Sequence, residues 1–497
     1  MEKTLLLKGV KAIVTCDAED RVYRGADLLV RGGRIESIAV PQAGAGAGDC
    51  AVPQAGAGIA DTGVPQAGAD IAGRSEVAAD EVIDGSRYIV YPGLVNTHHH
   101  FFQTFVRNLI RVDFVNVTLA EWLDEIYRIF AHIDGDVIYY SSLTAMADLV
   151  KHGCTTAFDH QYCFTTATGK TPIDRQFAAA REIGIRYHAG RGTNTLPRSE
   201  GSTMPDEMVE STQEFLDDCA RVIGLYHNPD PLSYAQIVMA PCQPINCYRD
   251  TFTETVRMAR EAGVRMHTHL CEGENDIMLE RWGKRTLAWA EEAGFIGDDV
   301  WYAHGWDLLP EEYAVMGRTG TGVSHCPTPA ILGGSPILPM QQMQRAGINI
   351  SLGCDGSATN DSSNLLDALR TGWLMQAWHS KARGGCISPY EMLKIATVNG
   401  AKTLGRTDIG YLAPGMAADF FLIDADTLEL TATAHDAKNL LARTGVTGPV
   451  AMTFIGGKAV YADGKIAGID ERALAAEGAE VLARVLSGKC AAYQNLD

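Results

Sequence analysis

The stretch YIVYPGLVNTHHH, residues 88–100, joins an apolar run to three adjacent histidines. In an extended segment successive side chains point to opposite faces, so His98 and His100 are expected to share one face while His99 points away. The same pattern, a short β-branched or aromatic run that ends in polar residues before a helical stretch, occurs seven more times. These runs are GCTTAFDH (153–160), GIRYHAGRG (184–192), AQIVMAPCQ (235–243), GVRMHTHLCE (263–272), VWYAHGW (300–306), GTGVSHCP (320–327) and INISLGCDG (348–356).

Eight strand-plus-helix units over about 250 residues predict a (β/α)8 TIM barrel, an α/β fold whose active site lies at the carboxyl ends of its strands. The polar residues of the eight runs fall at those ends. An open doubly wound sheet is the alternative, but polar groups after nearly every strand favour a closed ring.

Short strand-like segments flank the barrel on both sides. ADLLVRGGRIESIAV reads as a hairpin with Gly32 and Gly33 at its turn, and VAMTFIGGKAVYADGKIAG near the other end has the same character. We therefore predict a small β-sandwich domain built from residues 1–87 and 409–497, the latter with a C-terminal helix, around a barrel of residues 88–408. A VPQAGA motif repeated from Val40, Val52 and Val64 predicts a Gly- and Ala-rich surface loop over residues 40–69.

The composition limits the partners and the compartment. A formal net charge of -19 argues against binding to nucleic acid, whose phosphates would be repelled. We find no secretory signal and no apolar run long enough to cross a membrane. Twelve cysteines without paired spacing fit a reducing environment, so we expect a cytoplasmic location.

Closure of a barrel would bring its first and last strands together, and with them the ionisable residues at their ends. His98, His100 and His269 with Asp355 then form a set of three nitrogens and one oxygen, suited to Zn²⁺ or a similar divalent ion. The alternative is that these are separate hydrogen-bonded core residues. His99 is expected to support the site or to pack rather than to bind the ion.

Glu272 follows His269 by three residues, just beyond the strand. A carboxylate beside an activated water can take its proton and pass it to a leaving group, which is general acid and base catalysis. The alternative role is an acid in the first turn of a helix, where the helix dipole favours a negative charge.

The segments PGLVNTHHHFFQ, HGCTTAFDH, HTHLCEGE, VWYAHGW, GTGVSHCP and LGCDGSATNDSSN together resemble the amidohydrolase superfamily, in its mononuclear deaminase branch. The resemblance covers nearly the whole chain. It implies that His98, His100, His269 and Asp355 hold one divalent metal ion, Zn²⁺, with Fe²⁺ as the alternative. It also implies that Glu272 shuttles protons, that His304 polarises the ring or stabilises the attacking hydroxide, and that Asp355 can accept the water's proton.

The resemblance extends to the substrate. Within the branch the chain is similar to enzymes that act on hydroxyatrazine, 8-oxoguanine and isoxanthopterin, so we expect an aminohydrolase that replaces an amino or alkylamino group on an oxo-substituted nitrogen heterocycle with hydroxyl. A hydroxyatrazine-type triazine is favoured over a purine or a pterin. Gln103 and Arg191 lie where the family places ring-binding groups, although either could be an ordinary structural polar group. Trp122, Tyr162 and Asn360 are further pocket candidates.

Two other functions stay open from the sequence. A cyclic amide hydrolase of the same superfamily would use two metals bridged by a modified lysine on the fourth strand, but that strand reads IVMAPCQ and has no lysine. A non-catalytic metal-binding protein would leave Glu272 and His304 without a role. We expect a small-molecule substrate as partner and assembly into a homodimer or larger homo-oligomer.

Overall fold

The computed structural model describes residues 3–40, 79–107, 114–117, 119–360, 362–380 and 386–487. The VPQAGA repeat, predicted as a loop over residues 40–69, lies outside the described residues apart from Val40. Within the described ranges, no helix is long and apolar enough to cross a membrane.

The central element is an eight-stranded parallel sheet whose strands follow one another in chain order. The ring closes between its first and last strands, where the Thr97 N–H donates to the Leu352 carbonyl at 3.0 Å and the Asp355 N–H donates to the His98 carbonyl at 3.0 Å. The predicted (β/α)8 barrel is confirmed. Its strands are β8 Leu94–Asn96, β9 Cys154–Gln161, β10 Arg186–Thr193, β11 Ala235–Pro241, β12 Arg265–Leu270, β13 Val300–His304, β14 Gly322–His325 and β15 Ile350–Leu352.

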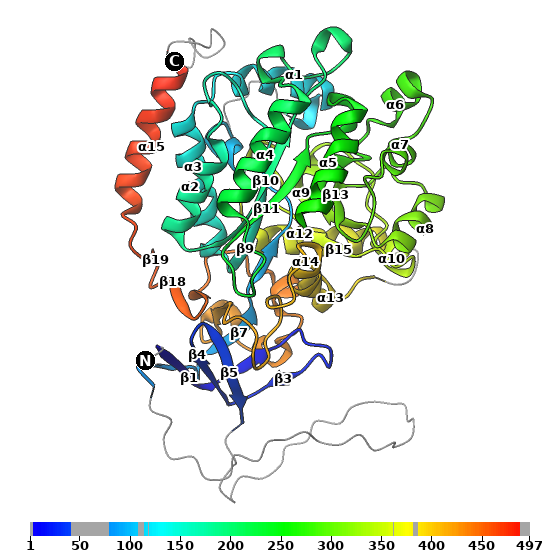
Figure 1. Cartoon of the computed structure of the whole chain (residues 1–497). Helices are drawn as coiled ribbons and strands as arrows, with labels where there is room; N and C mark the ends of the chain where they lie inside the picture. Colours follow the sequence, from blue (N-terminus) through cyan, green and yellow to red (C-terminus); the bar gives the residue numbers. More distant parts are fainter. Residues whose placement is uncertain are drawn as a thin grey trace, which may run out of the picture.

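Helices surround this sheet (Figure 1), and local sequence sets their ends. For example, α3 has Pro172 in its first turn and ends at Gly184, which adopts φ +80°. The helices are α1 Leu119–Phe130, α2 Gly135–Lys151, α3 Pro172–Ile183, α4 Thr212–Tyr226, α5 Arg249–Ala262, α6 Asn275–Trp282, α7 Thr286–Glu292, α8 Pro310–Thr319, α9 Pro327–Leu332, α10 Met340–Arg345, α11 Ser357–Asn360, α12 Leu365–Ser380, α13 Pro389–Ile395, α14 Val398–Thr403 and α15 Glu471–Leu486. Short helical turns are η1 Phe101–Phe105, η2 Phe114–Asn116, η3 Arg198–Glu200, η4 Asp206–Met208, η5 Pro244–Asn246, η6 Leu428–Leu430, η7 Ala434–Asp436 and η8 Leu441–Gly445.

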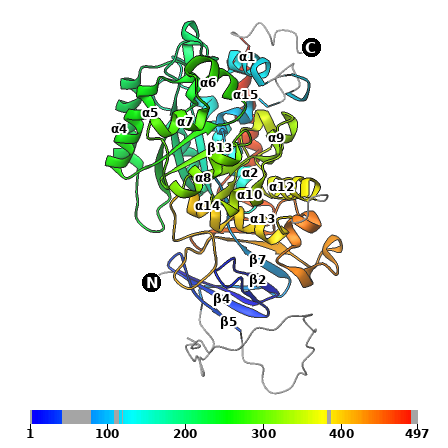
Figure 2. The same cartoon turned by 90° about the vertical axis from the view of Figure 1, so that its right-hand side faces the viewer.

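A small β domain lies at one end of the barrel, and α1 lies at the opposite end (Figures 1 and 2). The two sheets of the small domain have the strand orders β5-β4-β1-β6 and β19-β18-β17-β16-β7-β2-β3. Leu7 and Leu28 from the first sheet share a buried core with Val90 and Phe420 from the second, so the sheets form the predicted sandwich. The strands are β1 Thr4–Val10, β2 Ala12–Val14, β3 Val22–Tyr23, β4 Ala26–Arg31, β5 Arg34–Ala39, β6 Glu81–Asp84, β7 Tyr88–Pro92, β16 Phe420–Asp424, β17 Met452–Ile455, β18 Lys458–Ala462 and β19 Lys465–Ile466.

The strand pairings within residues 88–100 divide this run between the two domains. The run 88–100 contains two strands, because β7 pairs with β16 and β2 of the small domain and only β8 belongs to the barrel. The chain passes between them at Gly93, where an added Cβ would lie 2.0 Å from Thr155 Oγ1. The barrel therefore begins after Pro92 rather than at residue 88. The C-terminal helix α15 packs against α2 of the barrel (Figure 1), with Tyr140 donating to Glu477.

Candidate metal centre and active site

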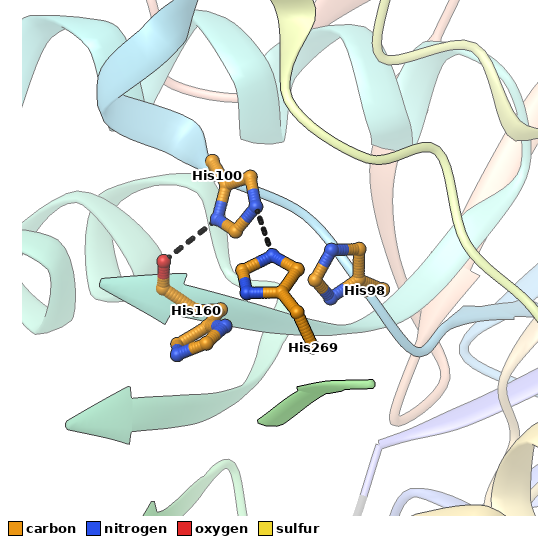
Figure 3. Close-up of side chains that lie close together, drawn as sticks. All are labelled: His98, His100, His160 and His269. Atoms are coloured by element: carbon orange, nitrogen blue, oxygen red, sulfur yellow. Dashed lines mark hydrogen bonds between the residues drawn. The ribbon is translucent and has the colours of Figure 1, made fainter. Parts of the chain in front are cut away.

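Three histidines and one aspartate converge at the carboxyl ends of the barrel strands. His98 and His100 follow β8, His269 lies near the end of β12, and Asp355 follows β15. Figure 3 shows the three imidazoles turned toward one another. His99 points elsewhere and pairs with Ser363 Oγ at 2.9 Å, as the alternation of side chains predicts.

The ligand-capable atoms have the spacing of a metal site. Nε2 of His100 lies 3.1 Å from Nε2 of His269, while Asp355 Oδ1 lies 3.4 Å from His98 Nε2 and 3.3 Å from His100 Nε2. Ligands about 2.0–2.1 Å from a tetrahedral ion are separated by about 3.3 Å. His98 Nε2 is buried and has no hydrogen-bond partner among the described residues. The residues fit a divalent metal ion.

The second ring nitrogens of His100 and His269 are fixed by hydrogen bonds to backbone carbonyls. Nδ1 of His100 donates to the His160 carbonyl and Nδ1 of His269 to the Cys242 carbonyl, both at 2.8 Å. A carbonyl can only accept, so both rings carry their proton on Nδ1 and a lone pair on Nε2. Burial lowers the pKa of His98, His100 and His269, which keeps them neutral near pH 7 and able to bind a metal.

Glu272 and His304 form a second pair beside the metal ligands. Glu272 Oε1 lies 3.3 Å from His304 Nε2, and Gln243 Nε2 donates to Glu272 Oε2 at 3.1 Å. Burial, with a smaller contribution from Asp355 and Glu274, raises the pKa of Glu272 well above its ordinary value. A raised pKa favours the protonated carboxyl group, the form that can give a proton to a leaving group.

Backbone strain occurs at three of the same strand ends. Cys271, His304 and Asp355 have φ values of +54°, +74° and +65°, a left-handed region that residues with side chains seldom adopt. Such strain clusters at functional sites, where surrounding structure maintains it to direct a side chain. Here Cys271 directly precedes Glu272, His304 belongs to the Glu272–His304 pair, and Asp355 is one of the candidate metal ligands.

These groups open into a cavity of about 370 Å³. Of the predicted substrate contacts, Gln103, Trp122 and Tyr162 line it. Apolar and aromatic side chains such as Trp122, Leu123 and Trp306 line it together with the polar groups of the metal site, a combination found in small-molecule sites generally. Lining residues that the sequence did not single out include Leu123, Tyr127, Gln243, Trp306, Pro329 and Thr359.

Two predicted contacts depart from expectation. Arg191 does not line the cavity. Its guanidinium donates to Asp218 and Glu210 and lies over the ring of Phe164, so the side chain is held away from the cavity. Asn360 also does not line the cavity, because its Nδ2 donates to the Cys354 carbonyl and its Oδ1 accepts from the Ser362 N–H. The Arg191 side chain is held by two carboxylates, and the Asn360 side chain fixes the local backbone.

Sequence analysis also missed residues that touch the ligands. His267 contacts His98, and His160 lies among the ligand histidines, with a nitrogen in the same cluster as His98, His100 and His269. His267 could have been noted from the alternation in HTH, which puts it on the same strand face as His269. Cys326 also has its sulfur in a cluster with His98 and Asp355.

Comparison with known proteins agrees with this geometry. The sequence pattern of the amidohydrolase family matches residues 89–460. The chain belongs to the amidohydrolase family. Hydroxydechloroatrazine ethylaminohydrolase from Pseudomonas sp. (strain ADP) is 44% identical over 488 residues, covering 98% of this chain and 96% of that protein. The 8-oxoguanine deaminase of Pseudomonas aeruginosa is 36% identical, covering 82% of this chain and 89% of that protein.

Solved structures of this family share the whole fold. A crystal structure of atrazine chlorohydrolase from Arthrobacter aurescens TC1, complexed with zinc, has a TM-score of 0.85 at 27% identity and covers 96% of this chain and 100% of that one. Family membership and the relatives confirm the expected enzyme class, a hydrolase acting on carbon–nitrogen bonds other than peptide bonds.

Proposed function

We propose that this amidohydrolase replaces an amino or alkylamino group on an oxo-substituted nitrogen heterocycle with hydroxyl. The observation that carries the proposal is that His100, His269, Asp355 and the Glu272–His304 pair line one cavity, with His98 directly beside Asp355. Water activation and proton delivery would then occur at the same place. This arrangement has no role in a protein that only stores or senses a metal.

The metal in this proposal is one divalent ion per chain, held by His98, His100, His269 and Asp355. Zinc is favoured over iron because three imidazoles and a carboxylate suit its tetrahedral preference, and because the related chlorohydrolase is complexed with zinc. The two-metal cyclic amide hydrolase is disfavoured, since strand β11 (Ala235–Pro241) contains no lysine to bridge two ions.

When bound, such an ion supplies Lewis acidity and lowers the pKa of a coordinated water toward about 7. Glu272 accepts the proton of the attacking water through Oε1 and then delivers it to the ring nitrogen substituent that departs. Gln243 fixes the other carboxylate oxygen, so that Oε1 stays turned toward His304. His304 lies where it can steady charge that develops during attack, and Asp355 provides a second acceptor for the water's proton.

The substrate we favour is an oxo-triazine with an alkylamino leaving group. Its support is the 44% identity to the hydroxydechloroatrazine enzyme over nearly both chains. The apolar walls formed by Trp122, Leu123 and Trp306 suit an alkyl substituent better than a charged one. An 8-oxoguanine-type purine is the second candidate, supported by the 36% relative, and a pterin follows. A homodimer or larger homo-oligomer stays a prediction.

A substrate screen tests the proposal. Zinc-loaded protein is incubated with hydroxyatrazine, 8-oxoguanine, guanine and isoxanthopterin, and amine release is measured. We expect turnover to be fastest on the alkylamino triazine. Strong turnover of a purine or pterin with none on any triazine would reverse the substrate ranking. Absence of amine release from all four by protein that contains zinc would contradict the reaction itself.

A further inference from the structure

His267 is a buried imidazole to which the proposed reaction assigns no step. It lies on β12, two residues before His269, and is fully buried inside the barrel. Aromatic rings enclose it, with the Phe158 centroid at 4.7 Å and the Trp301 centroid at 4.8 Å. A polar ring in such surroundings loses its hydration, so the barrel must provide its hydrogen bonds.

Both nitrogens of His267 have partners. Nδ1 lies 2.9 Å from the Trp301 carbonyl oxygen, and Nε2 lies 2.9 Å from Nδ1 of His98. The carbonyl can only accept, so His267 donates from Nδ1 and, as a neutral ring, accepts at Nε2. The proton between the two histidines therefore belongs to His98 Nδ1. His98 Nε2 is left with a lone pair, facing Asp355 Oδ1 at 3.4 Å.

The backbone next to His98 is tied to the same tryptophan. Trp301 Nε1 donates to the Thr97 carbonyl at 3.0 Å. Trp301 therefore accepts the hydrogen bond of His267 through its carbonyl and also holds the backbone immediately before His98. His100 and His269 are held by backbone carbonyls, whereas His98 is held by a side chain. Among the three ligand histidines, only the support of His98 can be removed by a single substitution.

We propose that His267 is a positioning residue for the metal centre, which fixes His98 in the tautomer and orientation that presents Nε2 to the ion. The inference rests on the metal site in the proposed function. His267 does not line the substrate cavity and is separated from the metal-facing nitrogen by the His98 ring. Its effect should therefore fall first on metal affinity, and on turnover only through loss of the ion. Losing such support of a ligand typically weakens metal binding about 10- to 100-fold.

Three substitutions separate positioning from packing. His267→Gln keeps an acceptor for His98 and a donor for Trp301, so it should retain zinc nearly as well as the unaltered protein. His267→Leu fills the space but offers no acceptor. His267→Asn is polar but too short to reach both partners. Zinc affinity is measured by competition with a chromogenic chelator, and each variant's fold is checked by circular dichroism.

We expect His267→Leu and His267→Asn to bind zinc about 10- to 100-fold more weakly, and His267→Gln to stay close to the original affinity. His188→Leu is the matched control: His188 is a buried barrel histidine on β10 whose hydrogen bond is to Arg406, and its loss should leave zinc affinity unchanged.

The possible outcomes are distinct. If His267→Asn or His267→Leu folds and binds zinc as tightly as the original protein, His267 is only a packing residue and the inference fails. It also fails if His267→Gln loses zinc as severely as a folded Asn variant. If neither the Leu nor the Asn variant folds, His267 is required for the barrel itself and the positioning role is rejected. If the unaltered protein binds no divalent ion, the proposed function fails first.

Discussion

At the scale of single residues, Glu272 is the group on which the proposed chemistry depends most. An aromatic amine leaves poorly as an anion, so its nitrogen must be protonated. Glu272→Gln keeps the shape and the contact distance to His304 but cannot carry a proton. We expect amine release to fall about 10²- to 10⁴-fold while zinc content is unchanged. A chloro analogue, whose leaving group needs no proton, should lose less and serves as the control substrate.

Retention of more than about a tenth of the original amine release would be far outside that range. The proton-transfer role would then pass to His304, which lies 3.3 Å from Glu272. Elemental analysis of the same preparation separates this result from simple loss of metal.

The residues of the site differ in how far the sequence could predict them. One rule, that the carboxyl ends of the strands meet at one end of a barrel, was enough to predict the grouping of His98, His100, His269 and Asp355. Arg191 obeys the same rule yet turns to Asp218 and Glu210. The strand position of Arg191 predicts that it lies at the rim of the barrel, but it does not predict the direction of its side chain. That direction is set by the two carboxylates, which come from a helix and a loop whose packing the local sequence pattern does not encode.

At the scale of elements, eight apolar runs that each end in polar residues were enough to predict the barrel. The division of residues 88–100 between two sheets could not be predicted, because an apolar strand looks alike whether it pairs with β9 or with β16. The sequence favoured a closed ring, but it did not show how closely β15 approaches β8 to close it. Gly353, just after β15, permits that approach: an added Cβ would lie 2.8 Å from both His98 Cβ and Ser324 Oγ and 3.0 Å from Cys326 Sγ.

Gly353→Ala should therefore push the end of β15 away from β8 and separate Asp355 from the histidines. We expect a lower zinc content and lower turnover with near-normal secondary structure, measured by elemental analysis and circular dichroism. Gly224→Ala, in α4 where nothing lies within 4 Å of an added Cβ, is the control and should be neutral or stabilising by about 0.5–1 kcal/mol. Full zinc occupancy in Gly353→Ala would show that the ring tolerates a wider approach.

At the scale of the whole molecule, one buried ion pair joins the small domain to the barrel. Arg186, the first residue of β10, donates from Nε to Asp419 Oδ2 at 2.6 Å and from Nη2 to Oδ1 at 3.0 Å. Asp419 directly precedes β16 and also accepts from the Gly456 N–H at 2.7 Å. Both side chains are almost completely buried, with exposures of 1% and 2%. Water cannot replace a partner that is removed.

Asp419→Ala should lower the free energy of unfolding by about 3–5 kcal/mol, because it leaves a buried guanidinium unpaired. Glu261→Ala is the control: it removes a carboxylate that Arg257 contacts on the exposed face of α5, where such pairs contribute about 0–1 kcal/mol. Urea unfolding followed by circular dichroism and by tryptophan fluorescence measures both. Replacing the pair together, as Arg186→Met with Asp419→Leu, should recover much of the loss, since it removes both buried charges. Equal unfolding midpoints for Asp419→Ala and Glu261→Ala would mean that this buried ion pair contributes no more to stability than an exposed one.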